Sequence, residues 1–275
     1  MPEIQAHAER LTADYRGSIL ERFRPLSFVA LKTALPSPTE AEGRPLDQVG
    51  RRGKYLLATF GDRTFVIHLM QGGRLKPDPK QSPKPRGGVA RWRFTDERAW
   101  LLSEAGTEHK VGVWMAAGDP ATSDVFAHLG PEANELDQAG WAAVLASHPM
   151  RLHGLLRDQR AVAGLGRRLA NEICWAGKLS PFANAAKLKD AEVERLTAAV
   201  GSCLSESLQY ERSRPDMSSS ADRPGAVHRR TGETCPDCGD AVRAVEYRAY
   251  TVNYCPSCQT GGKVLADNTT SRFLR

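Results

Sequence analysis

Four cysteines near the C-terminus have the spacing of a metal-binding site. Cys235 and Cys238 form one C-x2-C pair, sixteen residues follow, and Cys255 and Cys258 form a second pair. Each C-x-x-C turn can direct two thiolates at one point, and the intervening residues suffice for a β-hairpin that brings the turns together. The pattern predicts one structural Zn²⁺ in a closed tetrahedral site. Two disulfides or a chance spacing are the alternatives.

The other two cysteines and the N-terminal sequence argue against disulfides. Cys174 and Cys203 fall in apolar helical patterns, and the chain opens without a basic-then-apolar signal pattern. No apolar run approaches the roughly 20 residues that a bilayer crossing needs. We therefore expect a cytoplasmic protein without membrane association.

Positive charge is concentrated in one part of the chain. The 275 residues carry a net charge of +6, and the segment 51–93 holds eleven Lys or Arg but only two acids. A concentration of this kind favours a polyanionic partner such as nucleic acid. The chain length allows two or three domains.

An amphipathic helix is predicted at residues 3–16. Ile4, Ala8, Leu11 and Tyr15 lie on one helical stripe. Such a helix would hold the α-amino group of the chain on a folded element, which is unusual because most chain ends are poorly ordered. The simpler interpretation is a terminal helix that packs on a sheet.

Short apolar runs bounded by Gly, Pro and Asp follow between residues 27 and 114. They predict strands of an antiparallel sandwich or barrel: FVALKT, YLLATF, TFVIHL, VARWRF, AWLLSE and VGVWMA. The segment Gly61-Asp62-Arg63 joins two of them as a hairpin loop. Residues 76–88, with four prolines and two glycines, predict an exposed basic loop.

Helical periodicity replaces the strand pattern after Pro120. Four helices are predicted: 136–146, 151–160, one that follows the Gly164 to Gly166 turn, and one from Asp190 to about Leu208. Residues 211–225 lack an apolar period and predict a flexible linker.

The expected fold is therefore α+β and multidomain. Residues 1–130 would form an N-terminal helix plus an antiparallel β-sandwich. Residues 131–225 would form a helical domain with the linker, and residues 226–275 a β-hairpin zinc finger and tail.

The order of these elements resembles the formamidopyrimidine-DNA glycosylase and endonuclease VIII family, which has a helix-two-turn-helix domain and a C-terminal zinc finger. Five segments carry the resemblance: the Met-Pro-Glu start, RRGKYLL at 51–57, a partial H-L-x-M-x-G at 68–73, the G-x-G turn and helix at 164–175, and C-P-x-C-Q at 255–259. The resemblance spans essentially the whole chain and is typical of a divergent bacterial branch.

The resemblance implies a bifunctional DNA glycosylase and abasic-site lyase of base excision repair, acting as a monomer on damaged double-stranded DNA. Pro2, freed by removal of Met1, would attack C1′ through its secondary amine and form a Schiff base. Strand cleavage by β- or β,δ-elimination would follow. Glu3 resembles the acid/base residue that protonates the sugar ring oxygen. Lys54 corresponds to the lysine that contacts phosphate beside the lesion.

Further DNA contacts are implied, although several positions carry residue types that the family does not. His68 matches a phosphate-binding histidine. At the other positions the family's residue differs and is given in parentheses: Gln71 (a void-filling methionine), His109 and Val111 (an arginine and phenylalanine wedge), Arg167 (asparagine), His228 (tyrosine) and Tyr250 (a phosphate-binding arginine). Two neighbouring arginines, Arg74 and Arg248, are further candidates for DNA contact, and Arg248 lies two positions from Tyr250. A smaller wedge predicts a preference for lesions that are already unstacked.

Two other functions stay open at this point. A catalytically weak relative would bind damaged or abasic DNA without turning it over, because several phosphate-contact positions have changed. A zinc-ribbon interaction module would explain the cysteines, but not the Met-Pro-Glu start or the RRGKYLL strand.

Overall fold

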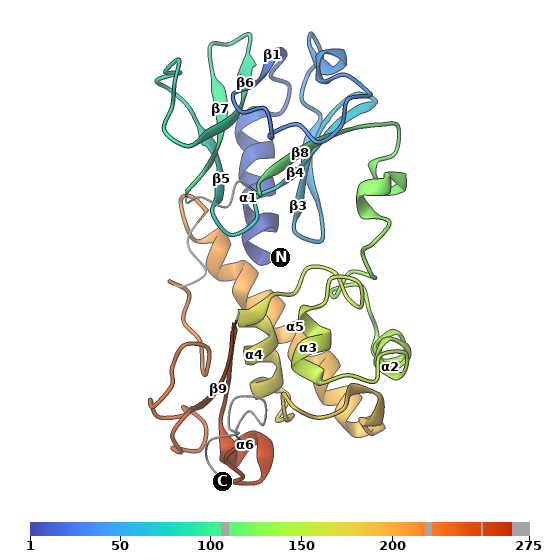
Figure 1. The fold of residues 1–275 in the computed structure, drawn as a ribbon, viewed down its shortest axis with the longest axis vertical. Coiled ribbons are helices and arrows are strands. Elements are labelled where there is room, and N and C mark those ends of the chain that lie inside the picture. The colour runs from blue at the N-terminus through green and yellow to red at the C-terminus, as the bar shows by residue number, and fades with distance from the viewer. Residues whose placement is uncertain (106–109, 218–221, 249, 266–275) are drawn as a thin grey trace. The chain divides into compact units, whose positions relative to one another are not determined.

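The chain has an α+β fold, as predicted, which combines antiparallel sheets with a set of helices (Figure 1). A computed structural model describes residues 1–105, 110–217, 222–248 and 250–265. Contacts divide the chain into two compact units. One is Ile4–His128, and the other combines Met1–Glu3 with Leu129–Arg275.

The first unit contains two four-stranded antiparallel sheets. One sheet has the order β1-β6-β7-β5, with bounds Leu20–Pro25, Gly88–Phe94, Ala99–Glu104 and Gly73–Pro77. The other has the order β2-β3-β4-β8, with bounds Gln48–Arg52, Tyr55–Phe60, Arg63–His68 and Gly112–Ala117. Because the sheets share no strand, the unit is a sandwich rather than a closed barrel. The pairing of Phe60 with Arg63 confirms the predicted hairpin.

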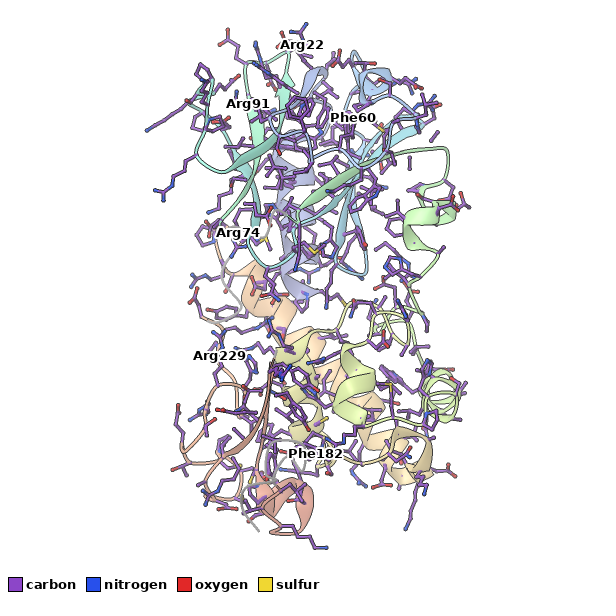
Figure 2. The ribbon with its side chains drawn as sticks, viewed as in Figure 1. Arg22, Phe60, Arg74, Arg91, Phe182 and Arg229 are labelled. Atoms are coloured by element: carbon purple, nitrogen blue, oxygen red, sulfur yellow. The ribbon has the colours of Figure 1, made fainter. Side chains whose placement is uncertain are left out.

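Aromatic side chains join the two sheets. The ring of Phe65 in β4 lies 4.9 Å from that of Phe23 in β1 and 5.5 Å from that of Trp92 in β6. Figure 2 shows Phe60, also fully buried, inside this unit and Arg22 at its surface. Rings of this size supply much of the apolar area that a small sandwich can remove from water.

Helix α1 (Pro2–Tyr15) confirms the predicted N-terminal helix. The four residues of its apolar stripe are all buried. Tyr15, at the C-terminal end, packs 5.3 Å from Phe94 and 5.0 Å from Trp100, measured between ring centroids. This end of α1 is therefore anchored on the sheet that contains β6 and β7.

One predicted strand was wrong. The segment 28–33 forms only an isolated parallel bridge between Leu31 and Val113, while Phe28 and Val29 are exposed. The first strand instead is β1, in a stretch of charged residues whose inward positions are Leu20 and Phe23. An apolar run is insufficient for a strand when its side chains find no core to enter.

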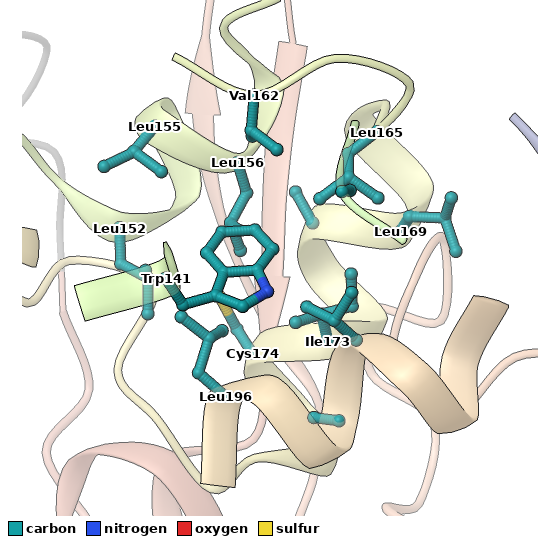
Figure 3. Packing of buried hydrophobic residues seen from close by; sticks show 14 of the residues in the cluster. Trp141, Leu152, Leu155, Leu156, Val162, Leu165, Leu169, Ile173, Cys174 and Leu196 are labelled. Carbon is teal, nitrogen blue, oxygen red and sulfur yellow. The ribbon is translucent and has the colours of Figure 1, made fainter. Parts of the chain in front are cut away.

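The helices of the second unit surround an apolar core, shown in Figure 3 around Trp141. They are α2 (Gln138–Ala146), α3 (Leu152–Arg157), α4 (Arg167–Ala176) and α5 (Asp190–Arg212). Leu152, Leu156, Ile173 and Leu196 are fully buried there.

Short 3-10 turns occur in both units, at Pro38–Ala41, Pro120–Thr122, Asp124–Phe126 and Ala185–Lys187.

The predicted flexible linker was wrong at both of its ends. Glu211 lies in α5 and is completely buried, and the side chain of Arg223 is only 5% exposed. Beyond it, β9 (Arg243–Tyr247) and β10 (Tyr250–Tyr254) form the expected hairpin, and α6 (Pro256–Thr260) follows. These two ends are held because Arg223 lies beside the buried Glu211 and binds Glu3, contacts that a periodicity argument cannot detect.

Candidate functional site

The N-terminal residues lie against the turn that precedes α4. The α-amino group of Met1 donates to the carbonyl of Gly164 (3.0 Å) and lies 3.5 Å from a carboxylate oxygen of Glu3. Gly164 has a φ of +95°, and a Cβ at this position would come within 2.3 Å of the Met1 side chain. The positive φ favours glycine in this turn, whereas the close contact is with the flexible end of the Met1 side chain. Pro2, the expected nucleophile, is the first residue of α1 and is buried.

Glu3 is held by a cation that sequence reasoning missed. Its other carboxylate oxygen accepts from Nη2 of Arg223 at 2.5 Å, and the Glu3 side chain is 16% exposed. Burial on its own raises the pKa of Glu3, but the α-ammonium group and Arg223 outweigh it and place the pKa at about 2. Glu3 is consequently an ionised carboxylate in the free protein.

Arg223 is itself fixed from α4. Arg168 is buried and donates from Nη2 to the carbonyls of Arg223 and Pro224, the latter at 2.6 Å. Glu172 then accepts the backbone N–H groups of residues 226–228 at 2.8 to 3.2 Å. These two side chains determine the path of the chain between α5 and the C-terminal hairpin.

Lys54 and His68 occupy neighbouring strand ends in the sandwich. Lys54 immediately precedes β3, and Tyr55 pairs with His68 across the sheet. Burial lowers the pKa of His68, and the nearby charge of Lys54 lowers it further, to about 4. Its Nδ1 accepts from the backbone N–H of Met70 (3.0 Å), so the neutral ring carries its proton on Nε2. The pair thus presents one cation and one neutral N–H donor.

The turn after His68 exposes two side chains. Gln71 is exposed, and so is Met70, which adopts a left-handed φ of 50°. A Cβ on Gly72 would lie 2.4 Å from the carbonyl of Ala105, so the turn depends on a glycine there. Arg74, visible in Figure 2, donates from Nη1 to the carbonyl of Gly73 at 2.7 Å. Met70 is an exposed apolar residue that the sequence analysis did not select.

One of the two residues expected to form the DNA wedge, Val111, does not lie at the surface. Val111 is 1% exposed and packs over Gly73, so it is part of the sandwich core and is not available as a wedge. The assignment of Val111 as a wedge was wrong because valine is apolar and is readily buried where the chain path places it against a core. His109 lies outside the described residues.

The remaining expected contacts lie on α4 and the C-terminal hairpin. Arg167 is the exposed first residue of α4, and His228 bonds through Nδ1 to the Asn171 side chain at 2.9 Å. The pKa of His228 is lowered to about 4, first by burial and then by Arg168 and other arginines nearby. One of these is Arg229, labelled in Figure 2.

The hairpin tip contains Arg248 and Tyr250. Because Tyr247 pairs with Tyr250, Arg248 lies in the turn and is exposed. One face of the Tyr250 ring is covered by Arg157, whose guanidinium carbon lies 3.6 Å from the ring centroid. Arg157 is the last residue of α3 and is another residue that sequence reasoning missed.

The four cysteines come together as predicted. Their sulfur atoms lie within 4.8 Å of one another, with Cys235 to Cys258 at 3.9 Å and Cys238 to Cys255 at 3.3 Å. A tetrahedral ion with bonds of about 2.3 Å separates its sulfur ligands by about 3.8 Å. All six cysteines, including Cys174 and Cys203, are free thiols in the structure. The donor set fits a four-coordinate metal ion.

Nitrogen donors surround this potential metal site. The indole N–H of Trp175 in α4 donates to Cys235 at 3.4 Å, and the ammonium of Lys178 donates to Cys258 at 3.8 Å. Hydrogen bonds of this kind orient metal ligands and offset the charge of four thiolates.

Comparison with known proteins identifies the class to which this chain belongs. The family model for the formamidopyrimidine-DNA glycosylase N-terminal domain matches residues 1–105, and that for the H2TH domain of the same enzymes matches residues 129–218. The formamidopyrimidine-DNA glycosylase of Symbiobacterium thermophilum is 32% identical over 94% of this chain and 88% of its own length. The chain therefore belongs to the formamidopyrimidine-DNA glycosylase family.

Individual relatives agree with this assignment. A formamidopyrimidine-DNA glycosylase-like protein of Mycobacterium tuberculosis is 40% identical over 149 residues, which are 54% of this chain and 94% of that protein. The Lactococcus lactis formamidopyrimidine-DNA glycosylase, solved non-covalently bound to DNA containing an abasic site, has the same fold. Its TM-score is 0.83 at 20% identity, over 94% of this chain and 99% of that one.

Among the residues that the structure describes, no helix is both long and apolar enough to cross a membrane.

Proposed function

We propose that this protein is a bifunctional DNA glycosylase with abasic-site lyase activity, working as a cytoplasmic monomer on damaged double-stranded DNA in base excision repair. The arrangement at the N-terminus carries the proposal. The α-amino group of Met1 is buried, lies 3.5 Å from a carboxylate oxygen of Glu3 and donates to the carbonyl of Gly164. Removal of Met1 would leave the nitrogen of Pro2, the next residue, as the chain-terminal amine close to the same groups. The Lactococcus lactis formamidopyrimidine-DNA glycosylase, which has the same fold, has been solved with DNA that contains an abasic site and with DNA that contains FAPY-dG, which supports damaged DNA as the partner of this protein.

Removal of Met1 would turn the nitrogen of Pro2 into a secondary amine. An α-amino group has an ordinary pKa of about 7.7 to 8.0, so a useful fraction is unprotonated near neutral pH. Attack on C1′ forms the C–N bond and releases the base with the glycosidic electron pair. Once the nitrogen has lost its proton, its lone pair opens the protonated sugar ring by breaking the C1′–O4′ bond, which leaves an iminium ion. The iminium acidifies the 2′ hydrogens, and their loss drives β-elimination of the 3′ phosphate.

The ionisation of Glu3 suggests how protons move in this reaction. With Met1 in place the pKa of Glu3 is about 2. Arg223 stays beside Glu3 when Met1 is removed, so Glu3 would enter as a carboxylate and could accept the proton of the attacking amine. The carboxylic acid thus formed can then protonate the sugar ring oxygen. Lys54 and the neutral His68 would supply one cation and one N–H donor to phosphates beside the lesion.

Covalent trapping tests the proposed function. Borohydride should reduce the iminium and yield a protein–DNA adduct with duplexes that contain an abasic site. Because Gln71 is polar and Val111 is buried, opening of a stable pair should be poorly supported, and adduct yield should be lower with 8-oxoguanine opposite cytosine. Retained binding to abasic DNA without any adduct would instead indicate a relative that binds damage without turning it over.

We propose that the metal at the four cysteines is Zn²⁺, in a structural role. Metal analysis should find about one zinc per chain, and Cys255→Ser should release it. Because metal binding and folding are coupled in small fingers, this variant should lose hairpin order and DNA affinity while the sandwich unfolds at its usual temperature. A metal-free preparation with full affinity and activity would contradict the proposal.

A further inference from the structure

Arg157 and Tyr250 form a contact that joins α3 to the C-terminal hairpin. The guanidinium carbon lies 3.6 Å from the ring centroid, a distance at which a cation interacts with the negative face of an aromatic ring. The ring of Tyr250 is also stacked on that of Tyr247, with centroids 4.7 Å apart and planes at 17°. The Tyr247 hydroxyl accepts from Nη1 of Arg151 at 2.5 Å. Tyr250 therefore belongs to a rigid stack, and Arg157 is held on it.

The charge of Arg157 is not neutralised by an acid. Across the described part of the chain, no carboxylate forms an ion pair with it, although it is half-buried. Burial lowers the pKa of Arg157, and the positive charge of Arg167 at the start of α4 also lowers it. Two arginines from two helices thus come near each other without a carboxylate at Arg157.

Two histidines, the buried His153 and the half-buried His228, report the same excess of positive charge. His153, whose ring is stacked 5.9 Å from Tyr250, has a pKa lowered to about 3 by burial and then by Arg157. His228 is affected in the same direction by other arginines. Because both pKa values are lowered, both rings are neutral near pH 7 and do not compete with Arg157 for an anion. Neither histidine supplies a negative charge that would pair with Arg157.

A guanidinium has five N–H donors in a planar fork, and an aromatic ring satisfies none of them fully. The stack on Tyr250 nevertheless restricts the plane of the fork, which reduces the conformational entropy lost when a ligand binds. A tetrahedral anion with several acceptor oxygens matches such a fork. Given the proposed function, the anion of this kind that the protein would meet is a backbone phosphodiester.

We propose that Arg157, oriented by the ring of Tyr250, binds a phosphodiester of the DNA backbone together with Arg167. This inference rests on the proposed function, because it takes DNA as the ligand. Arg157 is a binding residue in this proposal, and Tyr250 is a positioning residue that acts through it.

The proposal is tested by measuring how tightly the purified protein binds a short duplex that contains a tetrahydrofuran abasic analogue. Fluorescence anisotropy gives the affinity at each concentration of a KCl series. Arg157→Gln should weaken binding about tenfold and reduce the log–log salt slope by about 0.9, the value for one phosphate contact. Arg243→Gln is the matched control, since it removes one exposed arginine from the end of the C-terminal hairpin that is opposite Tyr250. The control should keep the wild-type slope.

Tyr250 variants distinguish positioning from simple charge. Tyr250→Phe keeps the ring and should bind like wild type. Tyr250→Ala should lose affinity, and combining it with Arg157→Gln should cost little more than either change alone, because both act on one contact. Additive losses would overturn the positioning role.

The alternative is that Arg157 only stabilises the C-terminus of α3, where a cation is favourable. An Arg157→Gln protein that unfolds at a lower temperature but keeps the wild-type salt slope would establish this and overturn the inference. That outcome leaves the proposed function intact if covalent trapping still succeeds. Absence of any duplex binding by the wild-type protein would instead reject the proposed function itself.

Discussion

A protein whose N-terminus is blocked should form no covalent adduct with abasic DNA. The change is a tag fused directly ahead of Pro2, which leaves its nitrogen as an amide without a nucleophilic lone pair. We expect the rate of trapping and strand cleavage to fall by at least about 10³-fold, as when an enzymatic nucleophile is removed. Borohydride trapping followed by peptide mapping measures this, and the adduct of the unblocked protein should map to the N-terminal peptide.

The control is the same preparation after a protease has exposed Pro2. Activity should return without refolding, which separates a chemical block from damage to the turn at Gly164. Pro2→Gly keeps a primary amine and should retain part of the lyase activity. Full activity with the tag in place, or an adduct at Lys54, would remove the nucleophile from the chain end.

Replacing Glu3 with glutamine should suppress base removal by about 10²- to 10⁴-fold, the usual contribution of a positioned acid/base group. Glutamine cannot accept the amine proton or return it to the ring oxygen. Cleavage of a preformed abasic site should fall less, because its sugar opens without loss of a base. Single-turnover assays on duplexes with a damaged base and with an abasic site measure the two steps separately.

Arg223→Met tests whether the ion pair maintains the ionised state of Glu3. A carboxyl group with a depressed pKa stabilises the fold above its unfolded pKa, near 4.3, and loses that contribution as the pH falls toward 2. The variant should therefore be less stable to urea at pH 7 by about 1–3 kcal/mol, and the gap should narrow as the pH falls below about 4.3. A gap that is independent of pH would show that Arg223 acts through packing alone.

Much of the framework could be predicted from local patterns. The stripe of α1, the hairpin at residues 61 and 62, and the helical periods of α4 and α5 each describe which face of an element must leave water. The spacing of the four cysteines from Cys235 to Cys258 likewise predicts the geometry of the metal site, because two C-x-x-C turns can close on one ion only in a few ways. These features depend on neighbours a few positions away, so sequence alone determines them.

Other features depended on which distant segments meet. Arg223 lies in a polar stretch without periodicity, and it is ordered because its partner, Glu3, is 220 positions away. Val111 matched a wedge position by sequence order, yet the fold places it in a core. Tyr250 suggested the loss of a positive charge, whereas α3 brings Arg157 onto its ring. Burial, ion pairing and stacking between remote residues are decided by the path of the chain, which only the tertiary structure specifies.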